Sequence, residues 1–291
     1  MNHRHALWGT LALILAVLLN GCIQPTHPIT EEESLTTATS AAVTEAAPVF
    51  VYQTMSYTYH TDVSNALNSI VTEFDPAYLT LVNRDNLLDA DHAPQALTEL
   101  TCATYNGKKV TLESRAATAL YAMLDEMMAD GITDVMVTSG YRTYEYQQQL
   151  YKQYLSKEKA RITPEAYAYF GEEYIQTQYL DQGVYRLSEE DAIKVVMSYS
   201  ALPGASEHQT GLCLDFVTST AMLTQGFENT EAFDWLSQNA YRFGFILRYP
   251  EDKTDVTGFS YEPWHFRFVG REAATELYFR NLTLEELSEI F

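Results

Sequence analysis

The segment SEHQTGLCLDFV, residues 206–217, runs from a polar loop into an apolar stretch and carries the most distinctive pattern of the chain. Residues 212–217 are apolar apart from Asp215, which is typical of a buried strand. A second segment, EPWHFR, leads into another strand candidate. Because His208 precedes the first strand, Asp215 lies on it and His265 lies on the second, we expect these side chains to meet at the end of a sheet.

These two segments hold the side chains that a catalytic metal site needs. Imidazole nitrogens and carboxylate oxygens are good ligands for Zn²⁺, and a catalytic zinc uses three protein ligands and keeps one position for water. We therefore expect His208, Asp215 and His265 to hold one zinc ion. Glu262 lies three residues before His265 and can take a proton from a zinc-bound water and pass it to a leaving amine. Arg142, on the turn after a predicted strand, can stabilise a developing oxyanion or bind a substrate carboxylate.

With these residues in this order, the chain resembles the VanY-type zinc D-alanyl-D-alanine carboxypeptidases, a family with D,D- and L,D-carboxypeptidase members. The matching motifs are Ser-Gly-Tyr-Arg at residues 139–142, Ser-x-His-x-x-Gly-x-x-x-Asp at 206–215 and Glu-x-x-His at 262–265. The resemblance covers about residues 78–272. It implies zinc ligands at His208, Asp215 and His265, the catalytic base at Glu262, and a catalytic Arg142 near the scissile carbonyl. It also implies substrate contacts at Ser139, Tyr141, Gln147 and Ser206.

The resemblance further implies a reaction, the hydrolysis of the C-terminal D-alanine from peptidoglycan stem peptides. Zinc lowers the pKa of its bound water toward 7, Glu262 takes the proton, and the hydroxide attacks the carbonyl without a covalent acyl-enzyme. Family members cleave either the D-Ala–D-Ala bond of pentapeptides or the L–D bond of tetrapeptides, and the sequence leaves both open. Peptidoglycan stem peptides are the expected partner, and no obligate protein partner is evident.

Two other functions compete with this interpretation. Ser156-x-x-Lys159 matches the first motif of the penicillin-sensitive serine enzymes, but the pattern is common in charged helices and no Lys-Thr-Gly follows it. The main alternative is a non-catalytic zinc- or peptide-binding cell-wall lipoprotein. Glu262 argues against it, because a protein that only binds has no need of a base.

The composition excludes some classes of protein. Lys and Arg total 18 against 39 Asp and Glu, and the net charge of −21 makes the chain a poor partner for nucleic acid, whose phosphates need a basic surface. The chain is not disordered overall, because 46% of its residues are apolar and 13% are aromatic, which is enough to build a core.

The N-terminal residues indicate export and lipid attachment. Arg4 precedes an apolar run over residues 7–19, which has the length of a signal-peptide core and is short for a membrane span. The run ends at Leu-Asn-Gly-Cys22, which resembles a bacterial lipobox; a plain secretory signal and an uncleaved anchor are the alternatives. We predict a lipoprotein signal peptide at residues 1–21, then a lipidated Cys22 and a flexible tether over residues 22–50.

The zinc carboxypeptidase domain is expected over residues 51–291, on a protein held by its lipid at the outer face of a bacterial membrane and facing the cell wall. Cys102 and Cys213 would then meet an oxidising exterior, and the sequence leaves open whether they pair. Cys213 stands where the family commonly has a small residue. We expect this change to affect packing or redox behaviour and not zinc ligation.

Helices and strands are mixed without a repeated βαβ pattern, so we expect an α+β fold, one domain with a small central antiparallel sheet flanked by helices. The family resemblance implies that this fold is Hedgehog/DD-peptidase-like, with the zinc site at the sheet edge. The expected strands are residues 51–60, 132–137, 212–217, 245–249 and 264–269. The expected helices are residues 62–74, 112–130, 143–156, 230–243, 271–280 and 284–290, with more helix over 163–200. Met123, Met127 and Met128 are expected to fill the core.

Tyrosines and acids are concentrated in one part of the chain. Ten of the 21 tyrosines fall between residues 141 and 185, and seven acids fall between residues 165 and 191. This pattern favours a solvated helical insertion over residues 155–200. The alternative is a lip over a binding cleft, where the tyrosine rings stack on sugar or peptide.

Overall fold

The two motif segments form the middle of a four-stranded antiparallel sheet. The computed structural model describes residues 57–69 and 74–287. The strands are β3 (Met136–Ser139), β4 (Cys213–Val217), β6 (His265–Phe268) and β5 (Phe245–Leu247), and they lie in that order. Asp215 on β4 pairs with His265 on β6 and with Ser139 on β3. The predicted α+β fold with a small antiparallel sheet is confirmed.

The alternation of side chains along the strands gives the sheet one apolar and one polar face. Successive residues of a strand point to opposite faces. Residues 214, 216, 266 and 268 are leucine or phenylalanine and join the main core, together with α2 (Ser114–Ala129). Cys213, Asp215, His265 and Arg267 alternate with them and are therefore on the other face. A second apolar cluster packs α9 (Arg271–Arg280) and α10 (Leu284–Leu287) against Ile246.

The turn after β3 is fixed by contacts to segments that are distant in sequence. Tyr141 N donates a hydrogen bond to Thr111 O over 2.7 Å, and Arg142 N donates to His208 O over 3.0 Å. Thr111 belongs to a hairpin of β1 (Leu97–Glu99) and β2 (Thr111–Glu113), which the sequence did not predict. His208 belongs to the 3₁₀ turn η4 (Glu207–Thr210). The turn therefore lies between the hairpin and the histidine loop.

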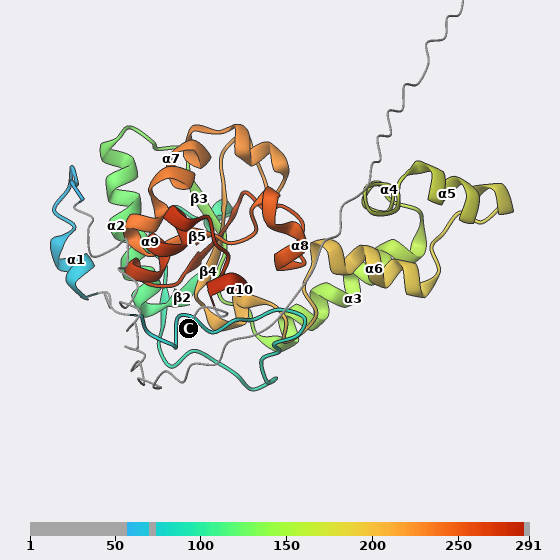
Figure 1. Cartoon of the computed structure of the whole chain (residues 1–291), viewed down its shortest axis with the longest axis horizontal. Coiled ribbons are helices and arrows are strands. Elements are labelled where there is room, and N and C mark those ends of the chain that lie inside the picture. The colour runs from blue at the N-terminus through green and yellow to red at the C-terminus, as the bar shows by residue number, and fades with distance from the viewer. Residues whose placement is uncertain (1–56, 70–73, 288–291) are drawn as a thin grey trace, which may run out of the picture. The chain divides into compact units, whose positions relative to one another are not determined.

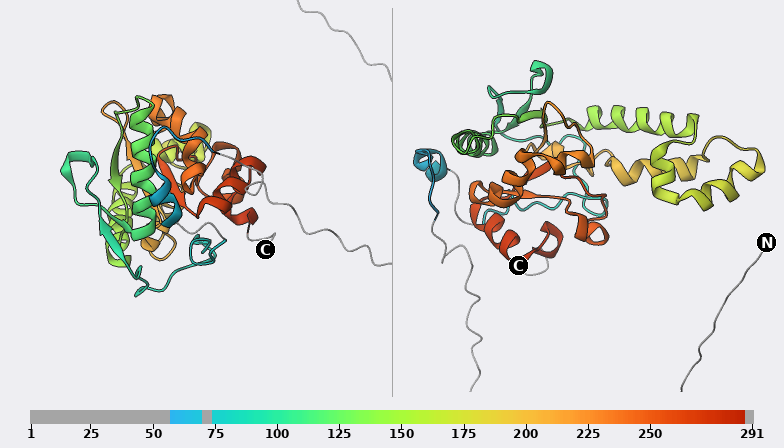
Figure 2. Two further views of the ribbon diagram at one scale, coloured as in Figure 1. Left: turned by 90° about the vertical axis from the view of Figure 1, so that its left-hand side faces the viewer. Right: turned by 90° about the horizontal axis from the view of Figure 1, so that it is seen from above.

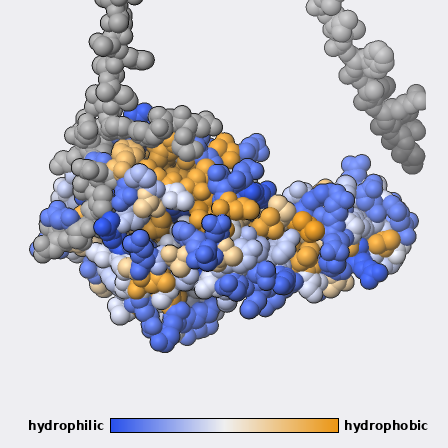
Figure 3. Space-filling model, turned by 90° about the horizontal axis from the view of Figure 1, so that it is seen from below, coloured by the Kyte–Doolittle hydropathy of each residue, from blue (hydrophilic) through white to orange (hydrophobic). Residues whose placement is uncertain are grey.

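Four helices form an arm beside the sheet. The long helix α3 (Tyr144–Ala160) packs along α6 (Glu189–Tyr199), and α4 (Pro164–Phe170) and α5 (Glu172–Gln178) lie at its far end (Figures 1 and 2). The arm has its own apolar cluster, which is Ala166, Ile175, Tyr179, Leu187, Ala192 and Val195. On the face shown in Figure 3, hydrophilic residues cover most of its surface. The predicted helical structure over residues 163–200 is confirmed, with breaks between the helices.

The helix starts and stops follow the local sequence. Thr143, Thr163 and Ser188 cap α3, α4 and α6, each accepting a hydrogen bond from a backbone N–H three residues ahead. The capping box at Thr283 and Glu286 is also present, because each residue binds the backbone N–H of the other. Helix 112–130 is confirmed as α2. The helix at 230–243 is split into α7 (Glu231–Asn239) and the 3₁₀ turn η6 (Ala240–Phe243).

Some expectations were wrong. The strand placed at residues 132–137 begins only at Met136, because Ile132 N donates to Met127 O and so closes the end of α2. Met128 is 61% exposed, whereas Met123 and Met127 are fully buried. Residues 57–60 are not in a strand, and residues 51–56 lie outside the described residues. Helix 62–74 is limited to α1 (Ser64–Ser69) in the part that the structure describes.

The signal peptide, Cys22 and the tether lie outside the described residues. Cys102 and Cys213 are both free thiols. In the part of the chain that the structure describes, no helix combines the length and the hydropathy needed to cross a bilayer.

The turn after β3 gives a test of this packing. A Cβ atom on Gly140 would overlap the carbonyl oxygen of Thr111 and lie 2.8 Å from Val110 Cγ1. Gly140→Ala should therefore lower the free energy of unfolding by about 1–3 kcal/mol, as overpacking usually does. Gly226→Ala is the control, because its Cβ would meet only the Thr224 hydroxyl, at 3.3 Å. Equal losses in urea denaturation of the two variants would contradict the described packing.

Candidate active site

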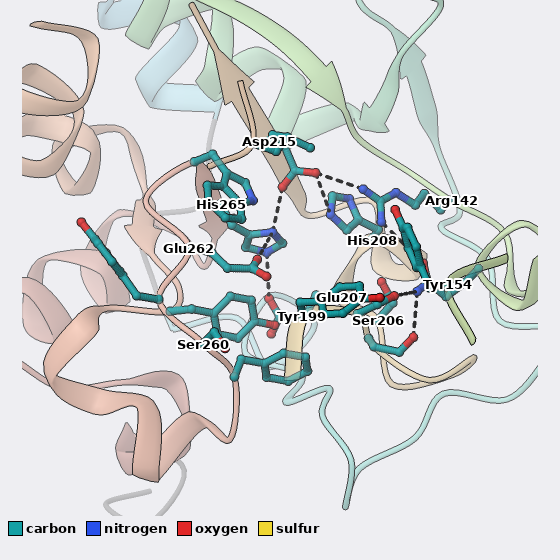
Figure 4. A pocket seen from close by; sticks show the side chains of 18 of the residues that line it. Arg142, Tyr154, Tyr199, Ser206, Glu207, His208, Asp215, Ser260, Glu262 and His265 are labelled. Carbon is teal, nitrogen blue, oxygen red and sulfur yellow. Dashed lines mark hydrogen bonds and ion pairs between the residues drawn. The ribbon is translucent and has the colours of Figure 1, made fainter. Parts of the chain in front are cut away.

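Three ionisable side chains from three segments meet at the polar face of the sheet. His208 comes from η4, Asp215 from β4 and His265 from β6, and all three are at most 4% exposed. Asp215 Oδ1 lies 2.9 Å from His265 Nδ1, and Asp215 Oδ2 lies 3.3 Å from His208 Nε2 (Figure 4). The structure thus brings together the three residues that the sequence predicted as metal ligands.

The orientation of His208 suits metal binding. Its Nδ1 atom lies 2.7 Å from Gly140 O, a carbonyl oxygen that can only accept, so Nδ1 carries the proton. Nε2, on the side of Asp215, is therefore the nitrogen that can give a lone pair to a metal ion. Two imidazole nitrogens and one carboxylate, all buried, fit the donor set of a divalent metal such as Zn²⁺.

Asp215 is kept ionised by its partners. Burial raises the pKa of this carboxyl, but the attraction and hydrogen bonds of His208 and His265 outweigh burial and hold the pKa well below its usual range. Arg142 Nη2 adds an ion pair to Asp215 Oδ2 at 3.0 Å. A buried carboxylate with three cationic or hydrogen-bonding partners stays ionised, which is the form that binds a metal ion.

Glu262 lies at the edge of the same cluster. Its Oε2 atom is 3.8 Å from His265 Nδ1. Burial and the charge of Asp215 raise the pKa of Glu262, the charges of His265, His208 and Arg142 oppose this rise, and the resulting pKa is about 7. A carboxyl with this pKa can both accept and release a proton near neutral pH, which suits a general acid and base.

Arg142 is held from both sides. Its Nε and Nη2 atoms donate to Ser139 Oγ over 3.0 and 2.6 Å, and its Nη1 atom reaches Gln147 Oε1 at 3.5 Å. Gln147 Nε2 donates to Ala201 O over 2.8 Å. Ser139 and Gln147, predicted as substrate contacts, therefore contact Arg142.

The cluster lies in a cavity of about 390 Å³. Gln147 and Ser206 line it, whereas Ser139 and Tyr141 do not. The arm contributes Tyr154 from α3 and Tyr199 from the end of α6, whose ring centroids are 5.5 Å apart (Figure 4). Of the ten tyrosines between residues 141 and 185, Tyr154 lines this cavity. Lys157 of α3 and Glu165 of α4 also line the cavity, so the arm borders it beyond its base. Stacking of the tyrosine rings on sugar or peptide stays a prediction.

Cys213 lies closer to the cluster than the sequence suggested. Ligand atoms of His208, Cys213 and His265 all lie within 4.8 Å of one another, and all three residues are buried. Burial raises the pKa of the Cys213 thiol, but attraction of the thiolate to both histidines lowers it to about 7. The signal was its spacing, because Cys213 is two residues before Asp215 and so shares its face of β4.

The serine-enzyme alternative finds no support in the geometry. Ser156 and Lys159 are exposed on α3, and Lys159 Nζ pairs with Glu189 Oε2 at 2.9 Å. Neither residue lines the cavity at the cluster.

Sequence reasoning also missed a set of buried ion pairs below the site. Glu207 is 1% exposed and pairs with Arg248 and Arg267, which are 1% and 0% exposed. Charged residues are expected at the surface, so composition gave no hint of this set. The available signal was again position, since Glu207 adjoins His208 and Arg267 is two residues after His265 on β6.

Comparison with known proteins identifies relatives of the chain. The family model described as VanY, D-alanyl-D-alanine carboxypeptidase, matches residues 109–271. A D-alanyl-D-alanine carboxypeptidase of Enterococcus faecalis is 37% identical over 208 residues, which are 72% of this chain and 64% of that protein. The chain thus spans slightly less than two thirds of the length of this relative.

Two solved structures share the fold. The LD-carboxypeptidase LdcB is 31% identical with a TM-score of 0.58, and the match covers 74% of this chain and 87% of that one. The D,D-pentapeptidase VanY from the VanB-type resistance cassette, in complex with Zn(II), is 36% identical with a TM-score of 0.55, and the match covers 72% and 98%.

The raised pKa of Glu262 predicts a pH-dependent stability of the metal-free protein. The unfolded chain ionises this group near pH 4.5, whereas the folded chain ionises it near pH 7. The free energy of unfolding therefore decreases as the pH rises from 4.5 to 7, and it stays lower above pH 7. Glu262→Gln cannot ionise and so does not show this decrease. The free energy of unfolding of the variant relative to wild type should therefore be about 1–3 kcal/mol higher at pH 8 than at pH 4.

Urea denaturation in the presence of a chelator, at both pH values, measures this difference. Glu172→Gln, on the exposed side of the arm, is the control. If the effect of Glu262→Gln on stability were the same at pH 4 and pH 8, the described environment of Glu262 would be wrong.

Proposed function

Because the chain belongs to the VanY family of D-alanyl-D-alanine carboxypeptidases, we propose that it is a zinc carboxypeptidase that removes the C-terminal D-alanine from peptidoglycan stem peptides. The observation that carries this proposal is the pairing of Asp215 with His265, with His208 and Glu262 beside them in one cavity. A protein that only binds zinc or peptide would not need Glu262 in this position.

His208, Asp215 and His265 are the proposed ligands of one zinc ion. Bound zinc supplies a Lewis acid and lowers the pKa of its water toward 7. Glu262 takes the proton of the attacking water and delivers it to the nitrogen of the departing D-alanine. Its pKa of about 7 in this structure fits a group that must hold and release a proton in one cycle.

Arg142 stabilises the charge that develops on the carbonyl oxygen. Its Nη2 atom donates hydrogen bonds to Asp215 and Ser139, whereas its Nη1 atom makes one long contact to Gln147. Nη1 is therefore the part of the guanidinium that can receive the oxygen. Ser139 and Gln147 serve this step by holding Arg142 in place, and Ser206 lines the cavity as a substrate contact.

Both types of bond, D-Ala–D-Ala and L–D, fit this chemistry, because the metal and the base act on the carbonyl and the leaving nitrogen in each. The similar structures include one protein of each kind, an LD-carboxypeptidase and a D,D-pentapeptidase. The choice depends on how the cavity receives the residue before the scissile bond. Tyr154 and Tyr199 of the arm are candidates for this contact, since both line the cavity.

The activity is tested with the zinc-loaded full chain, purified in detergent and incubated with pentapeptide and tetrapeptide muropeptides. Mass spectrometry should show loss of one D-alanine from at least one of them. Glu262→Gln should lower kcat by about 10²–10⁴-fold, the usual contribution of a general base. Zinc content should stay unchanged, and Ser156→Ala is the matched control with full activity. D-alanine release that survives both chelation and Glu262→Gln would sink the mechanism.

We also propose that the chain is an exported lipoprotein, with a signal peptide over residues 1–21, a lipid on Cys22 and a tether over residues 22–50. Support comes from the apolar run that stops just before Cys22 and from the polar composition that follows. A flexible tether of this length reaches about 30 Å, which lets the domain act on cell-wall peptides away from the outer face of the membrane.

Lipid attachment is tested by labelling cells that express the protein with radioactive palmitate. The wild-type chain should be labelled and should sediment with membranes, and Cys22→Ala should lose the label. Cys102→Ala should keep it, because this residue lies within the folded domain. An unlabelled wild-type chain, or a labelled Cys22→Ala chain, would contradict the proposal.

A further inference from the structure

A buried carboxylate outside the proposed ligand set faces the second nitrogen of His265. Glu207 Oε2 lies 3.8 Å from His265 Nε2. Both atoms are buried, and neither has a hydrogen-bond partner. Leaving two buried polar atoms unpaired costs free energy. A small movement that brings these two atoms into hydrogen-bond distance is therefore favoured.

The other side of the His265 ring faces the proposed metal site. Nδ1 lies 2.9 Å from Asp215 Oδ1 and 3.8 Å from Glu262 Oε2. A metal ion bound beside Asp215 would therefore be held by the lone pair of Nδ1. In a neutral imidazole the proton must then be on Nε2, on the side of Glu207.

Two guanidinium groups hold Glu207 in its ionised form and fix its position. Glu207 Oε1 accepts a hydrogen bond from Arg248 Nε over 2.8 Å and forms an ion pair with Arg267 Nη1 at 2.9 Å. Arg248 also forms a bidentate pair with Glu285 of α10, at 2.8 and 2.7 Å. Because both guanidinium groups contact Oε1, Oε2 is left for the histidine.

We propose that Glu207 is a positioning residue of the metal site, whose Oε2 atom accepts the Nε2 proton of His265 and so holds the ring with Nδ1 toward the metal. The inference rests on the proposed function only in requiring a metal beside Asp215. A carboxylate behind a metal-bound histidine fixes its tautomer, orients its ring and raises its basicity. The ion pairs with Arg248 and Arg267 supply the rigidity for this role.

Cys213 is the competing partner on the polar face, because its sulfur lies within 4.8 Å of a ring nitrogen of His265. A thiol accepts hydrogen bonds weakly, whereas a carboxylate accepts them strongly. Glu207 should therefore hold the proton on Nε2 whether or not Cys213 is present. Cys213→Ala separates the two groups experimentally.

The first test uses the wild-type chain and depends on no variant. NMR of the zinc-loaded full chain with ¹⁵N-labelled histidine reports which ring nitrogen carries a proton. His265 should show a slowly exchanging proton on Nε2, also in the Cys213→Ala chain. A proton on Nδ1 of His265 in the zinc-loaded chain, or loss of the Nε2 proton with Cys213→Ala, would overturn the proposal.

The second test compares two variants that remove one negative charge from the same set of ion pairs. Glu207→Gln should lower zinc affinity about 10–100-fold in competition with a chelator, and should shift the Nε2 proton resonance of His265. Glu285→Gln should change neither, because Glu285 contacts Arg248 and not the ring. Equal losses of affinity in both variants would show a purely structural role and overturn the proposal. Neither readout uses turnover, so absence of D-alanine release would count against the proposed function alone.

Discussion

The buried carboxylate of Asp215 is the group on which the rest of this structure depends. Removing an ionised carboxylate from water is costly unless charged and hydrogen-bonding partners replace the water. Here the partners are Arg142 at 3.0 Å, His265 at 2.9 Å and His208 at 3.3 Å, and each comes from a different segment of the chain. The turn after β3, the loop before β4 and the strand β6 must therefore come together for Asp215 to be satisfied. The same convergence makes the metal site, so fold and site follow from one constraint.

The sheet separates packing from chemistry. Phe216 and Phe266 on one face join the core with α2, whereas Asp215 and His265 on the other face form the cluster. Below the cluster the charges of Glu207, Arg248, Arg267 and Glu285 offset one another, which lets charged groups remain buried close to a metal site. The arm adds one wall of the cavity through Tyr154 and Tyr199. The packed sheet thus makes the site rigid, the buried ion pairs supply charge, and the arm encloses the cavity.

Much of the fold and of the candidate site could be predicted from the sequence, because strong periodicity and motif spacing mark the elements that carry them. His208, Asp215, His265, Glu262 and Arg142 were expected together, and the structure places them together. The β1–β2 hairpin was missed, since three-residue strands such as Leu97–Glu99, with exposed residues, show no clear alternation. Ile132 looked like the start of a strand but closes the end of α2, a contact set by the left-handed Gly131 before it. The position of Glu207 next to His208 marked it as close to the site, but only the tertiary fold places its carboxylate behind His265.

Anomalous X-ray diffraction at the zinc edge, on crystals of the zinc-loaded chain, tests the central claim most directly. The account predicts a single strong peak bound by Nε2 of His208, a carboxylate oxygen of Asp215 and Nδ1 of His265, with Glu262 close by and not bound. A peak bound by Cys213 in place of Asp215 would contradict it. So would the absence of any zinc between β4 and β6, because the pairing of Asp215 with His265 would then have no metal to hold.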